Sequence, residues 1–204
     1  MCGAGLMMLN AQDAKAAEEN APISNLKFDT NQPKHPVTPE METETSKSTL
    51  KSAPHFDVID GREVKHSIGD GERPQFLLFI LKGCPCSVDA QPIMNKLSKH
   101  FGNAVDFYGI TNGDQAEAKD WGVRYSVPFP VVADPSKAII HGYEAKHSVY
   151  SALVFHGKIV KMWPGYSVDM LAEINETIAK TAGQPVKHFD PEYAPPEKTS
   201  GCAF

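Results

Sequence analysis

The chain has 204 residues, a hydrophobic content of 41% and a formal net charge of −5. This length fits one domain with flanking segments, and no apolar run reaches the roughly 18 residues that a membrane-spanning helix needs. The 20 Lys and Arg residues are scattered along the chain. Nucleic-acid binding requires a clustered basic surface, so nucleic acid is not an expected partner.

Residues 1–52 are expected to be a leader and linker. The opening MCGAGLMMLNAQDA is apolar and then small, like the end of a secretory signal, but no Lys or Arg precedes its apolar stretch. Export and a cytoplasmic location therefore both stay open. The polar, low-complexity stretch 38–49 offers too little apolar surface to offset its ordering entropy, which predicts a linker or an arm draped over the domain without regular structure.

Strand and helix signals alternate between residues 53 and 182, the predicted domain. The uninterrupted apolar run 76–81 is typical of a central strand buried on both faces. Ser167 is a good N-cap for a last helix whose Leu171, Ile174 and Ile178 face inward. Strands are predicted at 56–59, 76–81, 105–110, 130–133, 151–155 and 158–162, and helices at 87–101, 114–121, 138–143 and from 167 onward. This order predicts an α/β fold with a mixed sheet that ends in a hairpin, followed by a Pro-rich, extended tail at 183–204.

The cysteines carry the functional signal. Of the four, at positions 2, 84, 86 and 202, two lie in the turn Cys84-Pro85-Cys86-Ser87 between the central strand and the first long helix. A helix N-terminus stabilises a thiolate and lowers its pKa, which makes Cys84 the expected nucleophile. Cys86 is the expected resolving partner, through a small and strained disulfide. The alternative is that both are buried apolar side chains without chemistry.

Three segments resemble a known family. They are Ala53-Pro-His-Phe-Asp-Val-Ile-Asp-Gly, the strand that ends in Cys84, and Phe129-Pro-Val-Val-Ala-Asp-Pro. Together they resemble the redoxin branch of the thioredoxin superfamily, which holds the alkyl hydroperoxide reductase/thiol-specific antioxidant (peroxiredoxin-like) proteins and the periplasmic thioredoxin-like reductases. The resemblance covers about residues 53–181. Pro92, eight residues after Cys84, matches the helix-kinking proline of thioredoxin-like proteins.

This resemblance implies a thioredoxin-like fold, with a central mixed β-sheet flanked by helices and extended N- and C-terminal tails. It implies a thiol-dependent oxidoreductase, of the disulfide reductase or antioxidant type, acting on a thiol or disulfide protein or on a peroxide. No cofactor is expected, because no Gly-rich phosphate loop is visible. A C-terminal resolving cysteine occurs in some two-cysteine peroxiredoxins, so Cys202 is a second, less favoured resolving residue.

The sequence also departs from the family pattern. Leu81 stands where peroxiredoxins carry a Thr, and their strand-borne Arg, which helps to hold the peroxide, has no counterpart between residues 147 and 154. Val149 or Tyr150 stands where thioredoxins have a cis-Pro. These departures weigh against a peroxidase more than against the fold.

Two other functions are compatible with the same residues. His147 precedes the hairpin strand, where thioredoxin-like copper chaperones of the Sco type place a histidine opposite two cysteines. Cys84, Cys86 and His147 would suit Cu or Zn, although Sco proteins space their cysteines differently. His147 could instead act as a base or hydrogen-bond partner to Cys84. Finally, the domain could keep the fold and use it only for interaction.

Overall fold

The computed structural model describes residues 35–204, so the leader-like opening and Cys2 lie outside the described residues. The strands are β1 (His35–Pro36), β2 (Phe56–Ile59), β3 (Lys65–Ile68), β4 (Gln75–Ile80), β5 (Asp106–Thr111), β6 (Val131–Ala133), β7 (Ser151–Phe155), β8 (Lys158–Trp163) and β9 (Thr199–Ser200). The helices are α2 (Pro39–Lys47), α3 (Pro85–Phe101), α4 (Gln115–Arg124), α5 (Ala138–Gly142) and α6 (Val168–Thr181), with a short 3₁₀ turn at Gly102–Ala104. Within this range no helix is long and apolar enough to cross a membrane.

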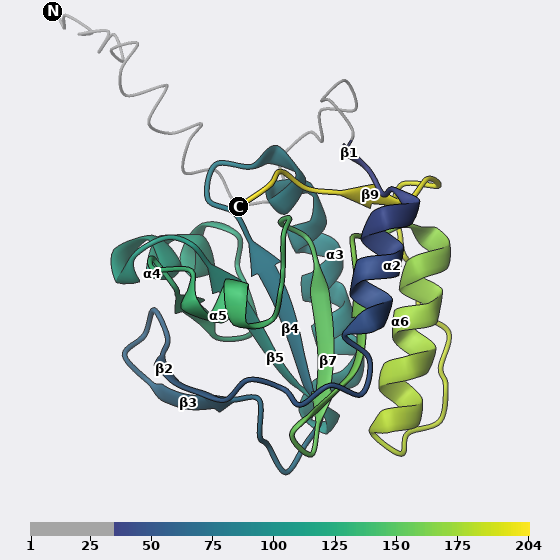
Figure 1. Cartoon of the computed structure of the whole chain (residues 1–204), viewed down its shortest axis with the longest axis horizontal. Coiled ribbons are helices and arrows are strands. Elements are labelled where there is room, and N and C mark those ends of the chain that lie inside the picture. The colour runs from purple at the N-terminus through teal and green to yellow at the C-terminus, as the bar shows by residue number, and fades with distance from the viewer. Residues whose placement is uncertain (1–34) are drawn as a thin grey trace, which may run out of the picture.

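Five strands form the central sheet in the order β6-β5-β4-β7-β8. β4 lies between β5 and β7 (Figure 1). β4 runs parallel to β5 and antiparallel to β7, so the predicted mixed sheet is confirmed. All six residues of β4 are buried, as expected for a central strand. Its side chains alternate between the two faces, with Phe76 in one apolar cluster and Leu77 in the other. β4 therefore gives rigid support to the turn that follows it.

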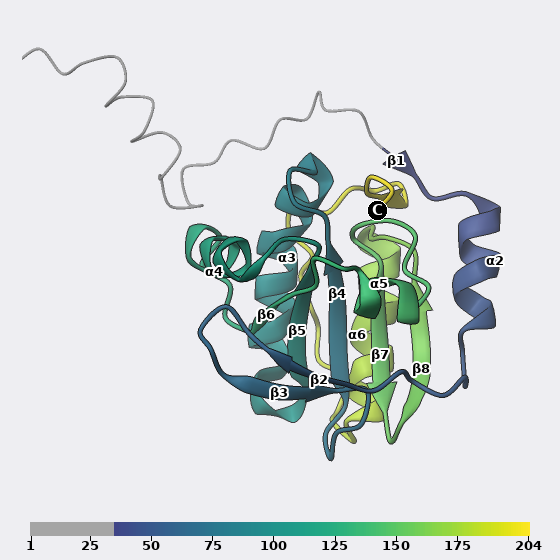
Figure 2. The same cartoon turned by 60° about the vertical axis from the view of Figure 1, so that its left-hand side comes forward.

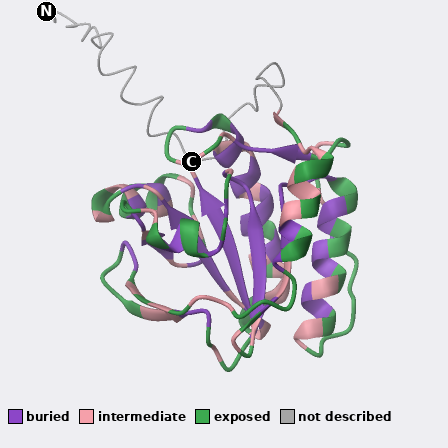
Figure 3. Ribbon diagram, viewed as in Figure 1, coloured by how far each residue is buried: buried purple, intermediate pink, exposed green. Residues whose placement is uncertain are grey.

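Helices cover both faces of the sheet (Figure 2). One cluster contains apolar side chains of α3 and α6, among them Met94, Leu97, Leu171, Ile174 and Ile178. The inward face predicted for the last helix is thus confirmed. The opposite cluster contains Ile139 and Ile140 of α5 and Ile68 of β3. The buried residues follow the sheet and the inner sides of the helices (Figure 3). β3, which pairs with β2 in a hairpin, was not predicted.

A buried chain of polar groups links α3 to α4. Trp121 Nε1 donates to Gln91 Oε1 at 2.8 Å, and Gln91 Nε2 donates to Asn95 Oδ1 at 2.9 Å. Gln91→Leu would leave the indole N–H buried without an acceptor, and we expect the free energy of unfolding to fall by about 1–3 kcal/mol. Urea unfolding measures it. The exposed Gln184→Leu is the control, with an expected change below about 0.5 kcal/mol; equal effects of the two would contradict this role of Gln91.

The expectation that 38–49 has no regular structure is wrong. Thr38 caps helix α2 by accepting from Met41 N at 3.3 Å, and Pro39 occupies the first helical position. The helix packs beside β8, and Met41 joins the cluster on that side of the sheet. Tertiary packing therefore offsets the ordering entropy that the composition alone could not. The domain limits 53–182 stay a prediction.

The segment 50–61 supplies backbone partners to both edges of the sheet. Leu50 N donates to Ile159 O of β8 at 2.8 Å, and Gly61 N donates to Val131 O of β6 at 2.8 Å. One short stretch of chain thus borders both outer strands of the sheet, β8 and β6.

Candidate active site

The site is built where β4 passes into α3. Gly83 takes a left-handed φ of +76°, which a glycine adopts without steric cost. Cys84 is the N-cap of α3, with φ −83° and ψ 120°, and Pro85 is the first helical residue. The Cys84 side chain therefore lies at the positive end of the helix, as predicted. It is only 2% exposed.

Three cysteines meet at this point. Cys202 Sγ lies 2.8 Å from Cys84 Sγ, although 118 residues separate the two in sequence. A disulfide bond is about 2.05 Å long, so a small movement would join them. Cys86, in the first turn of α3, hydrogen-bonds to Cys84 through its thiol. Sequence reasoning named all three residues and ranked Cys86 above Cys202 as the partner of Cys84.

Two further groups point at the Cys84 sulfur. Ser148 Oγ and the backbone N of Cys202 each lie 3.4 Å from Cys84 Sγ. Both are donors, so they stabilise a negative charge on the sulfur. Sequence reasoning missed Ser148, because an isolated serine beside a strand gives no local signal.

The hydrogen bonds give the three thiols different acidities. The bond from the Cys86 thiol, followed by those from Cys202 and Ser148, outweighs burial and lowers the pKa of Cys84 to about 3. The same bond to Cys84, together with burial, raises the pKa of Cys86 far above its ordinary range. Burial and the bond to Cys84 raise the pKa of Cys202 to about 11. The cluster thus holds one thiolate and two neutral thiols at neutral pH.

A strained loop brings Ser148 into place. Val149 has a φ of +65°, which is rare for a β-branched residue. Its N–H donates to Phe79 O at 2.7 Å, while the Ser148 N–H donates to Cys202 O at 2.9 Å. Backbone strain of this kind persists where the surroundings fix it, and it clusters at functional sites. Val149 is one of the two residues expected in place of a cis-proline.

The metal alternative is not supported. His147 Nδ1 lies 3.3 Å from Gly201 O, and its ring lies against Tyr150 at 5.6 Å between centroids. Neither contact involves the Cys84 sulfur. Across residues 35–204, no group of three or more His, Cys, Asp or Glu side chains is placed to hold a metal ion. A different histidine, His35, has its Nε2 3.7 Å from Cys202 Sγ.

Solved structures share this fold at low identity. An uncharacterized conserved protein from Geobacillus kaustophilus matches with a TM-score of 0.60 and 19% identity, over 76% of this chain and 90% of that one. Peroxidoxin BcpB from Mycobacterium tuberculosis matches with a TM-score of 0.55 and 14% identity, over 67% and 97%. The exposed lipoprotein thioredoxin Etrx1 of Streptococcus pneumoniae strain TIGR4 matches with a TM-score of 0.52 and 18% identity, over 64% and 98%. A comparison with curated proteins finds no match.

The fold of these neighbours is the thioredoxin-like fold that the sequence resemblance implied. The family model of AhpC/TSA matches residues 49–178, which run from before β2 into α6 and include the Cys84 turn. Membership supports a thiol-dependent redox function in general, with thiol or peroxide partners. The chain belongs to the AhpC/TSA family.

Proposed function

We propose that the protein is a thiol–disulfide oxidoreductase in which Cys84 is the nucleophile and Cys202 is the resolving cysteine. The observation that carries this proposal is the 2.8 Å separation of the two sulfur atoms. Cys86 is the less suitable partner, because Pro85 lies between it and Cys84. The fixed φ of Pro85 resists the distortion that a Cys84–Cys86 bond would need.

The cycle balances with thiols alone and needs no cofactor. The Cys84 thiolate attacks a substrate disulfide R–S–S–R′, a bond forms between Cys84 and the R sulfur, and R′S⁻ leaves. Cys202 then attacks Cys84 Sγ, its proton passes to the departing RS⁻, and the Cys84–Cys202 disulfide forms. Two electrons have moved from the protein thiols to the substrate, and an external dithiol restores the protein by the reverse steps.

The acidities suit this order of events. Part of the rise in the Cys202 pKa comes from the hydrogen bond to the Cys84 sulfur and from its charge. Once Cys84 is bound in a mixed disulfide, that charge is gone and Cys202 loses its proton more readily. Cys202 thus stays protonated until the step in which it attacks Cys84. Cys86, whose pKa is raised further still, is proposed to act as the donor that keeps Cys84 ionised.

Disulfide exchange is favoured over peroxide reduction by the groups around the sulfur. Peroxide cleavage releases an alkoxide or hydroxide, which a nearby cation stabilises. The described side chains that hydrogen-bond to Cys84 are those of Cys86, Cys202 and Ser148, and none of these is cationic.

The test is to map the disulfide that forms. The reduced protein is treated with glutathione disulfide, quenched by alkylation and analysed by peptide mass spectrometry. We expect a Cys84–Cys202 link with a reduction potential above about −300 mV, which is higher than that of typical structural disulfides. Cys202→Ser should stop at a Cys84–glutathione mixed disulfide, and the control Cys86→Ser should still form the Cys84–Cys202 link. A predominant Cys84–Cys86 link in the wild-type protein would refute the assignment of Cys202.

A further inference from the structure

The C-terminal segment, residues 198–204, lies across the active site and pairs with the rest of the chain through β9 and a single bridge between His147 and Ala203. Main-chain hydrogen bonds hold it to the domain: Tyr166 N to Thr199 O at 2.8 Å, Thr199 N to Tyr166 O at 2.9 Å, Ser148 N to Cys202 O at 2.9 Å, and Phe204 N to Lys146 O at 3.1 Å. These contacts explain why Cys84 is only 2% exposed. The segment must therefore move before an external molecule can reach the sulfur.

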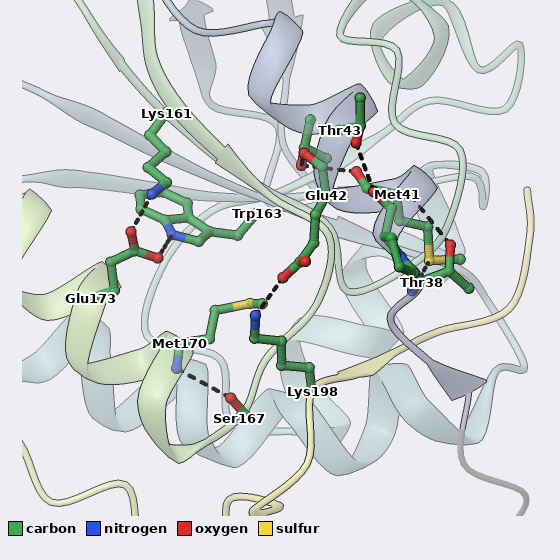
Figure 4. Close-up of polar contacts among 12 residues, drawn as sticks. Thr38, Met41, Glu42, Thr43, Lys161, Trp163, Ser167, Met170, Glu173 and Lys198 are labelled. Carbon is green, nitrogen blue, oxygen red and sulfur yellow. Dashed lines mark hydrogen bonds and ion pairs between the residues drawn. The ribbon is translucent and has the colours of Figure 1, made fainter.

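The same segment has a second set of partners on its outer edge. His35 of β1 pairs with Ser200 of β9, and Val37 N donates to Lys198 O at 3.0 Å. Lys198 also forms an ion pair with Glu42 of α2 (Figure 4). The C-terminal segment is therefore an inner strand, held between the domain and the first elements of the described chain.

The fit of the segment depends on backbone more than on side chains. A Cβ atom on Gly201 would lie 2.0 Å from Ser148 Oγ and 2.7 Å from Ser148 O. A Cβ atom on Gly165, on the domain side, would lie 2.1 Å from Thr199 O. Glycine at these two places allows the main chains to touch. Within the segment, the side chain of Cys202 contacts Cys84, with the two sulfur atoms 2.8 Å apart.

We propose that the groove formed by residues 146–149 and 165–166 is a binding site for an extended, cysteine-bearing strand of another polypeptide. The C-terminal segment is its internal, displaceable occupant. The sulfur of the incoming strand lies at the place of Cys202, preceded by glycine at the place of Gly201. The main-chain groups of Lys146, Ser148 and Tyr166 pair with any such strand, whatever its other side chains.

This proposal deepens the proposed function, because it names a protein strand as the substrate that meets Cys84. It makes a separate quantitative claim. A tethered occupant competes at an effective concentration on the order of millimolar, so the wild-type chain binds external strands weakly. A change that weakens the attachment of the C-terminal segment, or its fit in the groove, then increases the affinity for external strands without any change in the thiols.

The experiment measures binding without chemistry. The probe is a fluorescent synthetic peptide with the sequence of residues 197–204, in which serine replaces the cysteine, and binding is followed by anisotropy under reducing conditions. The chains are the wild type, Gly201→Ala, which clashes with Ser148, and Gly122→Ala as a matched control. A Cβ on Gly122 meets nothing nearer than Val131 Cγ2 at 4.0 Å.

We expect Gly201→Ala to bind the peptide at least about tenfold more tightly than the wild type and Gly122→Ala to match the wild type. A peptide with alanine in place of its glycine should bind at least about tenfold more weakly. Equal affinity of all three chains, or no discrimination between the peptides, would overturn the proposal. Because the probe has no thiol, the result does not depend on whether Cys84 and Cys202 form a disulfide.

A measurement on the wild-type chain covers the case in which Gly201→Ala does not fold. Saturating peptide should displace the C-terminal segment and speed hydrogen exchange at the amides of Thr199 and Phe204, while β4 amides stay protected. Unchanged exchange at both amides would contradict displacement. Size-exclusion chromatography could instead show a dimer, with the same amides protected from hydrogen exchange in that dimer. The groove would then belong to a second copy of this chain, and the proposal would fail.

Discussion

Replacing Cys84 with serine is expected to lower the single-turnover rate of glutathione disulfide reduction at least about 1,000-fold. A serine hydroxyl has nearly the same size, so the packing around a side chain that is 2% exposed should persist. The hydroxyl does not ionise under these conditions, and no nucleophile is left at the N-terminus of α3. Stopped-flow kinetics of the fully reduced protein measures the loss.

Cys202→Ser separates the two steps of the same reaction. It should form the mixed disulfide at Cys84 with little change in rate and then fail to release glutathione. Near-ultraviolet circular dichroism checks that each variant is folded. If Cys84→Ser reduced the disulfide as fast as the wild type, the nucleophile would lie elsewhere and Cys84 would be a packing residue in a domain that serves interaction.

The second large effect is on acid–base behaviour. Cys84 is expected to remain a thiolate from neutral pH down to about pH 3, where its pKa lies. The first cause is the hydrogen bond from the Cys86 thiol. Cys86→Ala should therefore raise the pKa of Cys84, while Cys86→Ser keeps a donor and should change it less. Ultraviolet absorbance of the thiolate, taken as the difference between the wild type and Cys84→Ser, reports the titration.

The same shift predicts how stability depends on pH. The folded pKa of Cys84 is below the ordinary value of 9.0, so the unfolded chain binds a proton more readily. The stabilisation is full above pH 9.0, and it is lost as pH falls through the interval down to about 3. Urea unfolding of the wild type and Cys84→Ser at several pH values should show their difference shrinking toward acid. A difference that grew toward acid would contradict a depressed pKa.

Much of the fold could be predicted because its signals are local. The run at 76–81 contains only apolar residues, and such a run has few solutions other than a buried central strand. The junction of that strand with Cys84 and Pro85 then places the nucleophile at a helix N-terminus. Helix α2 was missed although Thr38, Pro39 and two acidic residues in the first turn form a start signal. Its low apolar content outweighed these signals in the prediction.

The completion of the site could not be predicted, because it depends on contacts between distant residues. Cys202 approaches Cys84 across 118 residues, through a tail whose Pro-rich composition indicates only an extended chain. Ser148 and His35 reach the site by the path of the backbone and not by any motif. That Cys202 resolves Cys84 stays a prediction until the disulfide is mapped.

The borders of the sheet also affect self-association. Unpaired strand edges are templates for aggregation, and proteins cover them. In the described part of this chain, segment 50–61 pairs with both outer strands, whereas the groove beside Cys84 is covered only by a displaceable strand. Opening the active site therefore exposes backbone groups that can template intermolecular β-pairing. Access to Cys84 and colloidal solubility are therefore coupled through the C-terminal segment. A chain in which this segment is displaced should aggregate more readily than one in which it is bound.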